Sequence, residues 1–545
     1  MMHGANHAKG GSWIDCAGVG SARRIIARLV GVLLPMLSCQ VSSAAIIYVD
    51  ADAPGPVHDG ASWKTAYPHP DDAFADVIFN DEIRIAQGTY KPDASGMPDP
   101  RQATINLPSF AMIKGGYAGW GESDPDARDI DAFITRFSGD VLGDDLPGQN
   151  RDDNSFNVVT ANLVGPETTL SGVTVSGGNS TAPFAPPFFP LGKPGGGMWS
   201  VGTVTIESCT FRDNQAVVGG GMFNFEGSPI LLDTVFENNH AAQGGALGLF
   251  GTDDPLPASA GDGGVAHGTP SLSGCRFENN TASEFAGGVW VDGIAENPTF
   301  TDCRFLGNSA VGDGGGMWSG GGFCNLRNCL VAGNVAGDEG GGIYADTLVN
   351  VYHSTFFGNV AEAGGGMYYV FVRPGLLDSI FWGNEAGDAT GENAQASGGF
   401  LPPLADYSCI EGWTGDWGGE GNIGLDPGFI PGPDGCFYLD PVRSGCIDVG
   451  STTAVDKGLQ FSTTHRDENP DVSVVDLGFH FPISGLAYLP GDSNRDRQND
   501  LRDVAAFQWC LGEDASPCCL VFDIDGDTSV SLADLAGFVG TIDGP

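Results

Sequence analysis

The feature that most constrains this chain is a repeat that recurs seven times from residue 209 onward. Each copy has a short apolar run, usually with Phe at its centre, and then an Asn three residues after that centre. An Ala and a glycine-rich triplet follow, and the triplet fades in the last copy. The repeated Asn residues are Asn214, Asn239, Asn280, Asn308, Asn334, Asn359 and Asn384. Their spacings are 25, 41, 28, 26, 25 and 25, so one copy carries an insertion of about 16 residues near positions 252–269.

A unit of about 25 residues with two short β-like runs and sharp turns cannot bury its apolar side chains alone. When such units stack, each run pairs in parallel with the same run of the next unit, about 4.8 Å away. Helical repeats would show helical periodicity, which this phrase lacks. The repeat therefore predicts an all-β solenoid, a parallel β-helix.

The alternation of side chains predicts what each position does. In the phrase CxF, Cys and Phe point inward, so Cys209, Cys275, Cys303 and Cys329 should form one inward column, with Thr234, Ser354 and Ser379 in its other slots. We interpret this column as small core residues rather than as redox groups. The Asn column should bond rung to rung through its side-chain amides, and the glycines should form tight corners.

Composition agrees with a turn-dense fold, since 85 of the 545 residues are Gly. Acidic residues outnumber basic ones by 68 to 24, for a net charge of −44. Such a chain has few cations with which to displace counterions, which argues against nucleic-acid binding.

The repeat resembles the FxxN…GGA[ILV] repeats of polymorphic outer-membrane proteins and of other bacterial right-handed parallel β-helices. This resemblance covers residues 165–400 and implies a right-handed parallel β-helix. Residues 46–164, with a short amphipathic helix expected over 71–79, resemble the N-terminal cap and first coils of the same exported family. Residues 401–487 resemble its closing segment.

The first 45 residues have the pattern of an export signal, in which three arginines precede the apolar stretch 29–37 and a small-residue site. That stretch is too short to cross a bilayer, and no later segment is apolar enough to do so. We therefore expect an exported protein, extracellular or at the cell surface, without a transmembrane span in the mature chain.

Two acidic loops near the C-terminus have the oxygen spacing that encloses a hard dication. The first offers side chains of Asp492, Asn494, Asp496, Asp500 and Asp503 and the carbonyl of Gln498. The second offers Asp523, Asp525, Asp527, Ser531 and Asp534 and the carbonyl of Ser529. Each runs into a short apolar helix. We predict that both bind Ca²⁺.

The paired loops resemble type I dockerin modules over residues 488–545, which implies a small α-helical calcium-binding module and, by analogy, a cohesin-like partner. Arg497 and Thr528 stand where such loops prefer Gly, so the loops depart from the family pattern there. Pairing of Cys510 with Cys518 or Cys519 would staple the module.

An aromatic residue follows the glycine triplet in six of seven coils, at a position that should point outward. These residues are Trp199, Phe223, Trp290, Trp318, Tyr344 and Tyr368, with Gly248 in the remaining coil. Two interpretations stay open. The rings could form a platform for sugars or another partner, or they could stack on one another as a structural ladder.

The sequence does not identify a reaction. It lacks the motif sets of polygalacturonases and pectate lyases, and Lys193 is the only Lys between residues 115 and 456. Asp140, Asp144 and Asp145 cluster in a segment that resembles a turn of the family. We expect a non-catalytic β-helix protein that binds polysaccharide or a cell-surface protein. The alternative is a polysaccharide lyase or glycoside hydrolase.

If the C-terminal loops hold Ca²⁺, the metal contributes to their folding, because the ligand oxygens repel one another without it. We expect EDTA to lower the melting temperature of the C-terminal module in the full-length protein, and excess Ca²⁺ to restore it. A thermal melt that is the same with EDTA and with Ca²⁺ would contradict the metal sites.

Overall fold

The computed structural model describes residues 44–145, 150–181, 194–251, 269–293, 297–433 and 435–483. The predicted leader through residue 43, the calcium loops and the three C-terminal cysteines lie outside the described residues. So does most of the predicted insertion.

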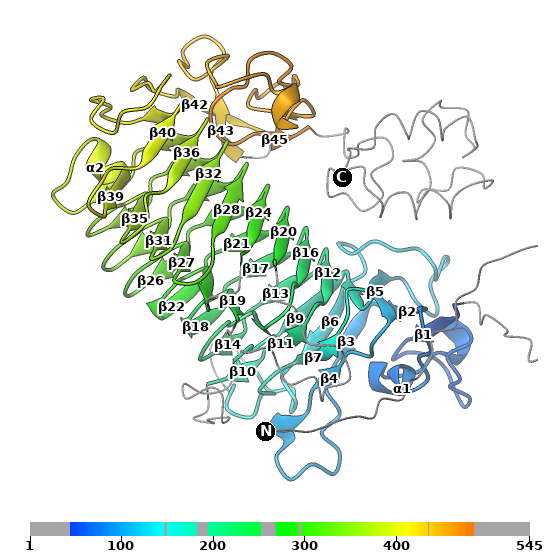
Figure 1. Ribbon diagram of the computed structural model, residues 1–545. Coiled ribbons are helices and arrows are strands. Elements are labelled where there is room, and N and C mark those ends of the chain that lie inside the picture. Colours follow the sequence, from blue (N-terminus) through cyan, green and yellow to red (C-terminus); the bar gives the residue numbers. More distant parts are fainter. Residues whose placement is uncertain are drawn as a thin grey trace, which may run out of the picture. The chain divides into compact units, whose positions relative to one another are not determined.

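The described chain winds through successive coils that build four parallel sheets, and from β8 to β39 each coil contributes one strand to each sheet (Figure 1). One coil, for example, runs through β24 (Thr299–Thr301), β25 (Arg304–Leu306), β26 (Ser309–Ala310) and β27 (Met317–Ser319). We number the sheets in this order along the coil. The parallel β-helix predicted from the repeat is confirmed.

The strands of the four sheets follow in ladder order. Sheet 1 contains β1 (Ile46–Val49), β2 (Asp81–Ala86), β5 (Ala111–Tyr117), β8 (Thr169–Ser171), β12 (Thr205–Glu207), β16 (Ile230–Leu232), β20 (Ser271–Ser273), β24, β28 (Cys324–Arg327), β32 (Val349–Tyr352), β36 (Gly375–Leu377) and β40 (Leu404–Asp406). Sheet 2 contains β3 (Gly88–Tyr90), β6 (Thr135–Ser138), β9 (Val173–Ser176), β13 (Thr210–Arg212), β17 (Val235–Glu237), β21 (Arg276–Glu278), β25, β29 (Leu330–Ala332), β33 (Thr355–Phe357), β37 (Ile380–Trp382) and β41 (Cys409–Ile410). Sheet 3 contains β10 (Asn179–Ser180), β14 (Gln215–Ala216), β18 (His240–Gln243), β22 (Thr281–Phe285), β26, β30 (Val335–Ala336), β34 (Val360–Ala361) and β38 (Glu385–Ala386). Sheet 4 contains β4 (Ile105–Asn106), β7 (Val159–Val164), β11 (Met198–Gly202), β15 (Met222–Phe225), β19 (Leu247–Phe250), β23 (Val289–Asp292), β27, β31 (Ile343–Ala345), β35 (Met367–Tyr369) and β39 (Ala396–Gly398).

Helices are short in the described chain. The helix expected over 71–79 is only α1 (Pro70–Phe74), because the chain leaves the helix after Ala75 and the amide of Ile78 is held by the Asp81 carboxylate at 2.7 Å. The others are α2 (Glu392–Gln395) and the 3-10 turns η1 (Trp63–Thr65), η2 (Pro100–Gln102) and η4 (Val455–Lys457). None of these helices has the length and apolar character needed to cross a membrane.

The Asn column forms a continuous buried ladder at the corner between sheets 2 and 3. Each side-chain amide donates to the side-chain oxygen of the Asn in the next coil, over 2.8 to 3.1 Å from Asn214 through Asn384. Asn308 shows the full pattern. Its Oδ1 accepts from both the backbone and the side-chain nitrogen of Asn280, and its Nδ2 also donates to the carbonyl of Phe277. Every polar atom of the buried amide is therefore satisfied.

The ladder ends in a different residue type. Gln395, the last residue of α2, accepts from the Asn384 amide at 2.7 Å and donates to the Glu411 carboxylate at 3.2 Å. Helix α2 thus supplies an amide where the coil repeat stops, so the last Asn keeps its partner.

The inward column at the start of the sheet 2 strands is as predicted. Cys209, Cys275, Cys303 and Cys329 are at most 1% exposed, and Thr234, Ser354 and Ser379 fill the intervening slots without exposure. Burial raises the pKa of Cys209 to about 12. Such thiols stay protonated at neutral pH, which agrees with a packing role.

Two different physical requirements explain why glycine occurs in the triplet. Gly314 adopts φ +71°, a left-handed conformation that favours Gly at this corner. The next residue, Gly315, needs no unusual φ, but a Cβ there would lie 2.3 Å from the carbonyl oxygen of Gly341 in the next coil. The first glycine permits the turn, and the second permits the close approach of the coils.

The predicted closing segment begins with β40 and β41, which still belong to sheets 1 and 2, and its remainder from residue 429 to 483, called the closing segment below, folds back over the outer face of sheet 2 (Figure 1). It contains the antiparallel pairs β42 (Phe429–Gly432) with β43 (Gly435–Leu439), and β44 (Ser462–Thr463) with β45 (Phe481–Pro482). Tyr438, Phe479 and Phe481 pack on Leu330 and Ala332 of β29. Hydrogen bonds fix the position, since the backbone amide of Phe479 donates to the Thr355 hydroxyl at 2.9 Å.

A buried polar cluster joins this segment to the corner between sheets 1 and 2. His353 is 1% exposed and Asp378 is not exposed at all. Asp378 accepts from the amide and the hydroxyl of Ser451, and its Oδ2 lies 3.3 Å from Lys457 Nζ and 3.7 Å from His353 Nδ1. Burial, aided by repulsion from His480, Lys457 and Arg327, lowers the pKa of His353 to about 2.

Replacing a ladder amide should be costly. We expect Asn308→Leu to lower the free energy of unfolding by about 3–5 kcal/mol, because the Asn280 amide and the Phe277 carbonyl would remain buried without partners. Urea denaturation measures the change. The control is Asn350→Leu, since Asn350 makes a 3.2 Å amide bond to Asn325 on the partly exposed outer side of sheet 1. The control should lose less than about 1 kcal/mol, and equal losses would contradict a special role for the buried ladder.

The buried imidazole of His353 predicts acid sensitivity. Its folded-state pKa lies below that of the unfolded chain, so the unfolded chain binds the extra proton and stability falls as the pH drops below about 6.5. Between pH 7 and pH 5, protonation of this histidine in the unfolded chain should lower the wild type's free energy of unfolding by about 2 kcal/mol.

The matched variant is His353→Asn, because Asn328 holds the same corner in the preceding coil with φ 50°, like His353 itself. Comparing denaturant unfolding at both pH values isolates the histidine from the many carboxylates. Wild type should lose about 2 kcal/mol more than the variant. Parallel pH profiles of the two proteins would contradict this account.

Candidate functional site

The predicted aromatic column lies on the outer side of sheet 4. In the in-register ladder, Trp199 pairs with Phe223, Phe223 with Gly248, Gly248 with Trp290, and the series continues to Tyr368. The residues beside them, such as Met317 and Met367, point into the core. The alternation that predicted an outward column is therefore confirmed.

The rings stack on one another. Trp290, Trp318, Tyr344 and Tyr368 form consecutive stacked pairs with centroids 6.2, 6.0 and 5.8 Å apart and planes within 17°. The structural ladder that the sequence left open as an alternative is thus present. Trp318 and Tyr344, the interior rings of this series, each have a stacked ring on both sides.

At Gly248, where the column lacks a ring, Phe250 of the same strand continues the stack. Phe225 and Phe250 lie two residues beyond the column position in their strands, and Phe250 stacks on Phe225 at 6.0 Å and on Trp290 at 5.9 Å. Phe223 lies against Gly248, where a Cβ would be 2.7 Å from its ring. The stack therefore continues where the repeat lacks an aromatic residue.

The two halves of the column differ in exposure. Phe223 is fully buried and Trp290 is 7% exposed, within a cluster that includes Val201, Val218 and Phe225. Trp318, Tyr344 and Tyr368 are partly exposed, and so is Trp199 at the N-terminal end of the column. The longest run of partly exposed rings therefore lies over the C-terminal coils, from β27 to β35.

Carboxyl groups border this exposed half. Asp313 and Glu339 directly precede the glycine triplets of consecutive coils, and the Asp313 carboxylate accepts from the Glu339 amide at 3.0 Å. Burial raises the pKa of both groups, and Asp338 raises it further by repulsion. These acids retain protons at a higher pH than exposed carboxyl groups do.

The two tyrosines pair with acids on opposite sides of the column. The Tyr344 hydroxyl donates to the Asp346 carboxylate at 3.2 Å, and the Glu339 carboxyl lies near the Tyr368 hydroxyl and raises its pKa. Burial and these carboxylates raise the pKa of both tyrosines, so the hydroxyls remain donors. We call Trp318, Tyr344, Tyr368, Asp313, Glu339 and Asp346 the tyrosine–carboxylate patch.

The chemistry of the patch is that of a polar recognition surface. Carboxylate oxygens and tyrosine hydroxyls can bond the hydroxyl groups of a ligand. Tyr368 is also the last ring of the stack, since its partner in β39 is Ser397. Its outer face is therefore not covered by another ring of the described chain.

Sequence reasoning identified the rings but missed the acids of the patch. A signal was present, because Asp313 and Glu339 precede the triplets of adjacent coils and Asp346 stands two residues after Tyr344. The bridging residue Phe250 had a similar signal, being two residues beyond the position that Gly248 leaves empty. To predict the acids or Phe250, the residues on both sides of the aromatic position in each coil have to be compared as well.

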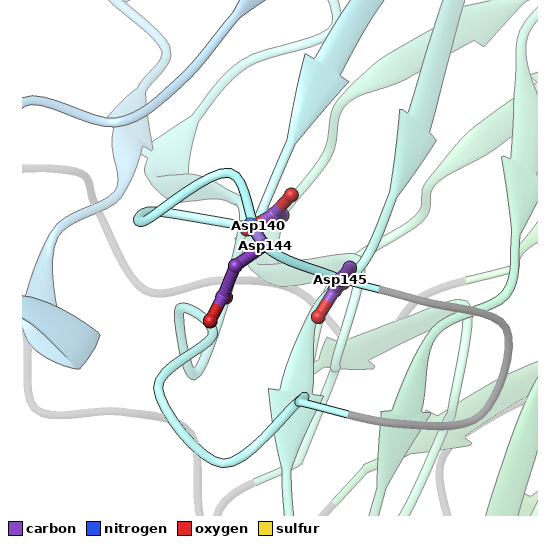
Figure 2. Close-up of side chains that lie close together, drawn as sticks. All are labelled: Asp140, Asp144 and Asp145. Carbon is purple, nitrogen blue, oxygen red and sulfur yellow. The ribbon is translucent and has the colours of Figure 1, made fainter.

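The acidic turn after β6 is a separate cluster (Figure 2). Asp140, Asp144 and Asp145 each place an oxygen within 4.8 Å of the others. Asp140 Oδ1 already accepts from the amides of Gly143 and Asp144, at 2.6 and 3.1 Å, and Asp145 accepts from Asn154 at 2.8 Å. The cluster is held together as a turn, as its sequence context predicted.

The predicted calcium ligands, residues 492–503 and 523–534, lie outside the described residues. Their arrangement stays a prediction.

Comparisons with known proteins concern the fold. The family model described as "Right handed beta helix region" matches residues 193–397. No curated protein shows significant similarity to the chain. Among solved structures, the pectate lyase Pel9A is 15% identical with a TM-score of 0.43, covering 81% of this chain and 98% of its own. A rhamnogalacturonan lyase is 13% identical with a TM-score of 0.39, covering 74% of this chain and 96% of its own. With the four parallel sheets, the family match identifies the fold as a right-handed parallel β-helix.

Proposed function

We propose that this protein is an exported, non-catalytic β-helix protein that binds polysaccharide at the tyrosine–carboxylate patch. The observation that carries the proposal is the pairing of Tyr344 with Asp346 and of Tyr368 with Glu339 beside partly exposed rings. Sugars present hydroxyl groups around an apolar ring face, which matches polar pairs around an aromatic face. The extracellular space or the cell surface is the proposed location.

The stacked geometry defines how a sugar binds. Interior rings of the column have no free face, so they offer edges and hydroxyls, and hydrogen bonding dominates there. Tyr368, at the end of the stack, is the position at which a sugar ring stacks. A polysaccharide that runs along the coil axis also meets the acids, so it needs few stacking contacts with aromatic rings.

Charge selects against acidic polysaccharides. The described strands of sheet 4 contain no Lys or Arg, and the whole chain carries a net charge of −44. A polyuronate would be repelled unless a cation bridged it to the acids. We therefore propose a neutral polysaccharide as the ligand, with a cell-surface protein as the alternative partner.

Truncation of the terminal ring should weaken binding. We expect Tyr368→Ala to reduce the affinity for a neutral polysaccharide roughly tenfold. This is the usual order for an aromatic side chain that becomes buried when the ligand binds. Affinity electrophoresis against a panel of neutral glucans, mannans and xylans, with polygalacturonate as the acidic member, measures the change.

The control is Tyr352→Ala, which removes a partly exposed tyrosine from the outer side of sheet 1. Its binding should equal that of the wild type. Equal binding by Tyr368→Ala and Tyr352→Ala, or retention only on polygalacturonate, would contradict the proposed site.

A second function is favoured by one observation. Asp313 and Glu339 lie on adjacent coils and have raised pKa values, and a carboxyl group with a raised pKa beside a second carboxyl group can act as a proton donor in glycoside hydrolysis. A lyase is less favoured, since the strands of this face supply no basic side chain. Reducing-end release by the wild type, lost in Glu339→Gln, would replace the non-catalytic proposal with hydrolysis.

We further propose that residues 488–545 form a Ca²⁺-binding, dockerin-like tail. The support is the oxygen spacing of the two loops, in which Asp492 and Asp523 open the series and Asp503 and Asp534 close it. A cohesin-like protein is the proposed partner of this tail.

A further inference from the structure

Two buried cysteines meet where the last coil contacts the closing segment. Cys409 belongs to β41, the final strand of sheet 2, and Cys446 follows the turn after β43. Neither is exposed, and both belong to one apolar cluster with Leu439 and Leu477. The structure records both as thiols.

The backbone holds each cysteine firmly in place. The amide of Cys409 donates to the Ser379 carbonyl at 2.8 Å, within the sheet 2 ladder. The amide of Cys446 donates to the Ser444 hydroxyl at 3.1 Å, and its carbonyl accepts from Leu477 at 2.9 Å. The Cys409 thiol donates to the carbonyl of Leu425 at 3.0 Å. Cys446 is the main influence on the pKa of Cys409, as expected of a neighbour in the same buried cluster.

We propose that Cys409 and Cys446 form a disulfide when the protein folds in an oxidising medium. With a low-molecular-weight disulfide such as oxidised glutathione, one cysteine thiolate attacks and releases a glutathione thiolate. The second cysteine thiolate then attacks the mixed disulfide and releases the other glutathione thiolate. The protein loses two protons and two electrons, and two molecules of reduced glutathione form.

The bond forms before packing is complete. The neighbouring Cys446 side chain and burial both raise the pKa of the Cys409 thiol, so the folded, reduced pair holds little thiolate. Solvent and oxidant are also excluded from a fully buried pair. Oxidation therefore accompanies docking of the closing segment, and the reduced folded protein resists later oxidation.

The inward cysteine column also brings thiols close together, since, besides burial, Cys275 and Cys329 raise the pKa of Cys303, but its spacing differs from that of a disulfide. Cys275, Cys303 and Cys329 stand on in-register parallel strands, as the pairing of Arg276 with Arg304 shows. Such neighbours keep a spacing of about 4.8 Å, whereas the Cβ atoms of a disulfide are about 3.8 Å apart. Cys409 and Cys446 come from separate segments that no common ladder holds apart. The column stays reduced, and the terminal pair oxidises.

The disulfide has a structural consequence. It closes a loop of 37 residues, the difference between positions 446 and 409. Cross-linking a loop of this length restricts the unfolded chain and favours docking of the closing segment. The covering of sheet 2 thereby becomes covalently secured to the last coil.

Peptide mapping tests the bond directly. The full-length protein is folded with oxidised and reduced glutathione, alkylated under denaturing conditions without reductant, and cleaved before aspartate. The cuts place Cys409 in 406–415, Cys436 in 434–439 and Cys446 in 440–447. We expect 406–415 joined to 440–447, at their summed mass less two hydrogens, and alkylated cysteines from the inward column.

The exposed Cys436 is the competing partner and provides the control. Cys436→Ser should leave the bond intact and Cys409→Ser should abolish it. Reductant should lower the melting temperature of the wild type by about 5 °C, and that of Cys409→Ser by much less. Alkylation of both cysteines after oxidative folding, or a link from 434–439 to either peptide, would overturn the proposal.

Discussion

The structure depends on one interaction, the bonding of each buried Asn amide to the same amide in the next coil. An amide in an apolar interior is costly unless all its polar atoms find partners, and here the partners come only from neighbouring coils. A coil that slipped by one residue would leave an Asn such as Asn308 without them. The ladder therefore fixes the register of the coils from Asn214 to Asn384, and the outward positions of those coils inherit that register.

This dependence explains what could be predicted from the sequence. A property repeated in every coil leaves a periodic record, so the parallel sheets, the Asn column and the inward Cys209–Cys329 column followed from spacing alone. The closing segment has no repeat. Its docking through Phe479 and Tyr438 depends on contacts between residues more than a hundred positions apart, for which a single sequence carries no periodic signal. The His353 cluster was hidden for the same reason.

The aromatic column shows how a correct position can leave its role open. Outward placement followed from alternation, but stacking depended on whether ring faces or ring edges meet solvent. In-register neighbours about one strand spacing apart cover each other's faces. The column therefore stabilises the outer side of sheet 4, and the recognition that we propose depends on the side chains around the ring edges. The acids Asp313, Glu339 and Asp346 occupy those edges.

The arrangement of the sheets also indicates why the patch lies on sheet 4. The closing segment covers the outer face of sheet 2 over the C-terminal coils, and most strands of sheet 3 have only two residues. On sheet 1, the guanidinium of Arg327 lies 5.5 Å from the ring centroid of Tyr352. This outward aromatic residue is therefore already engaged in a contact within the protein. Sheet 4 is the face on which rings, hydroxyls and acids remain together and partly exposed. A fold that repeats its core in every coil thus varies its outer faces, and sheet 4 is the face on which we propose that a ligand binds.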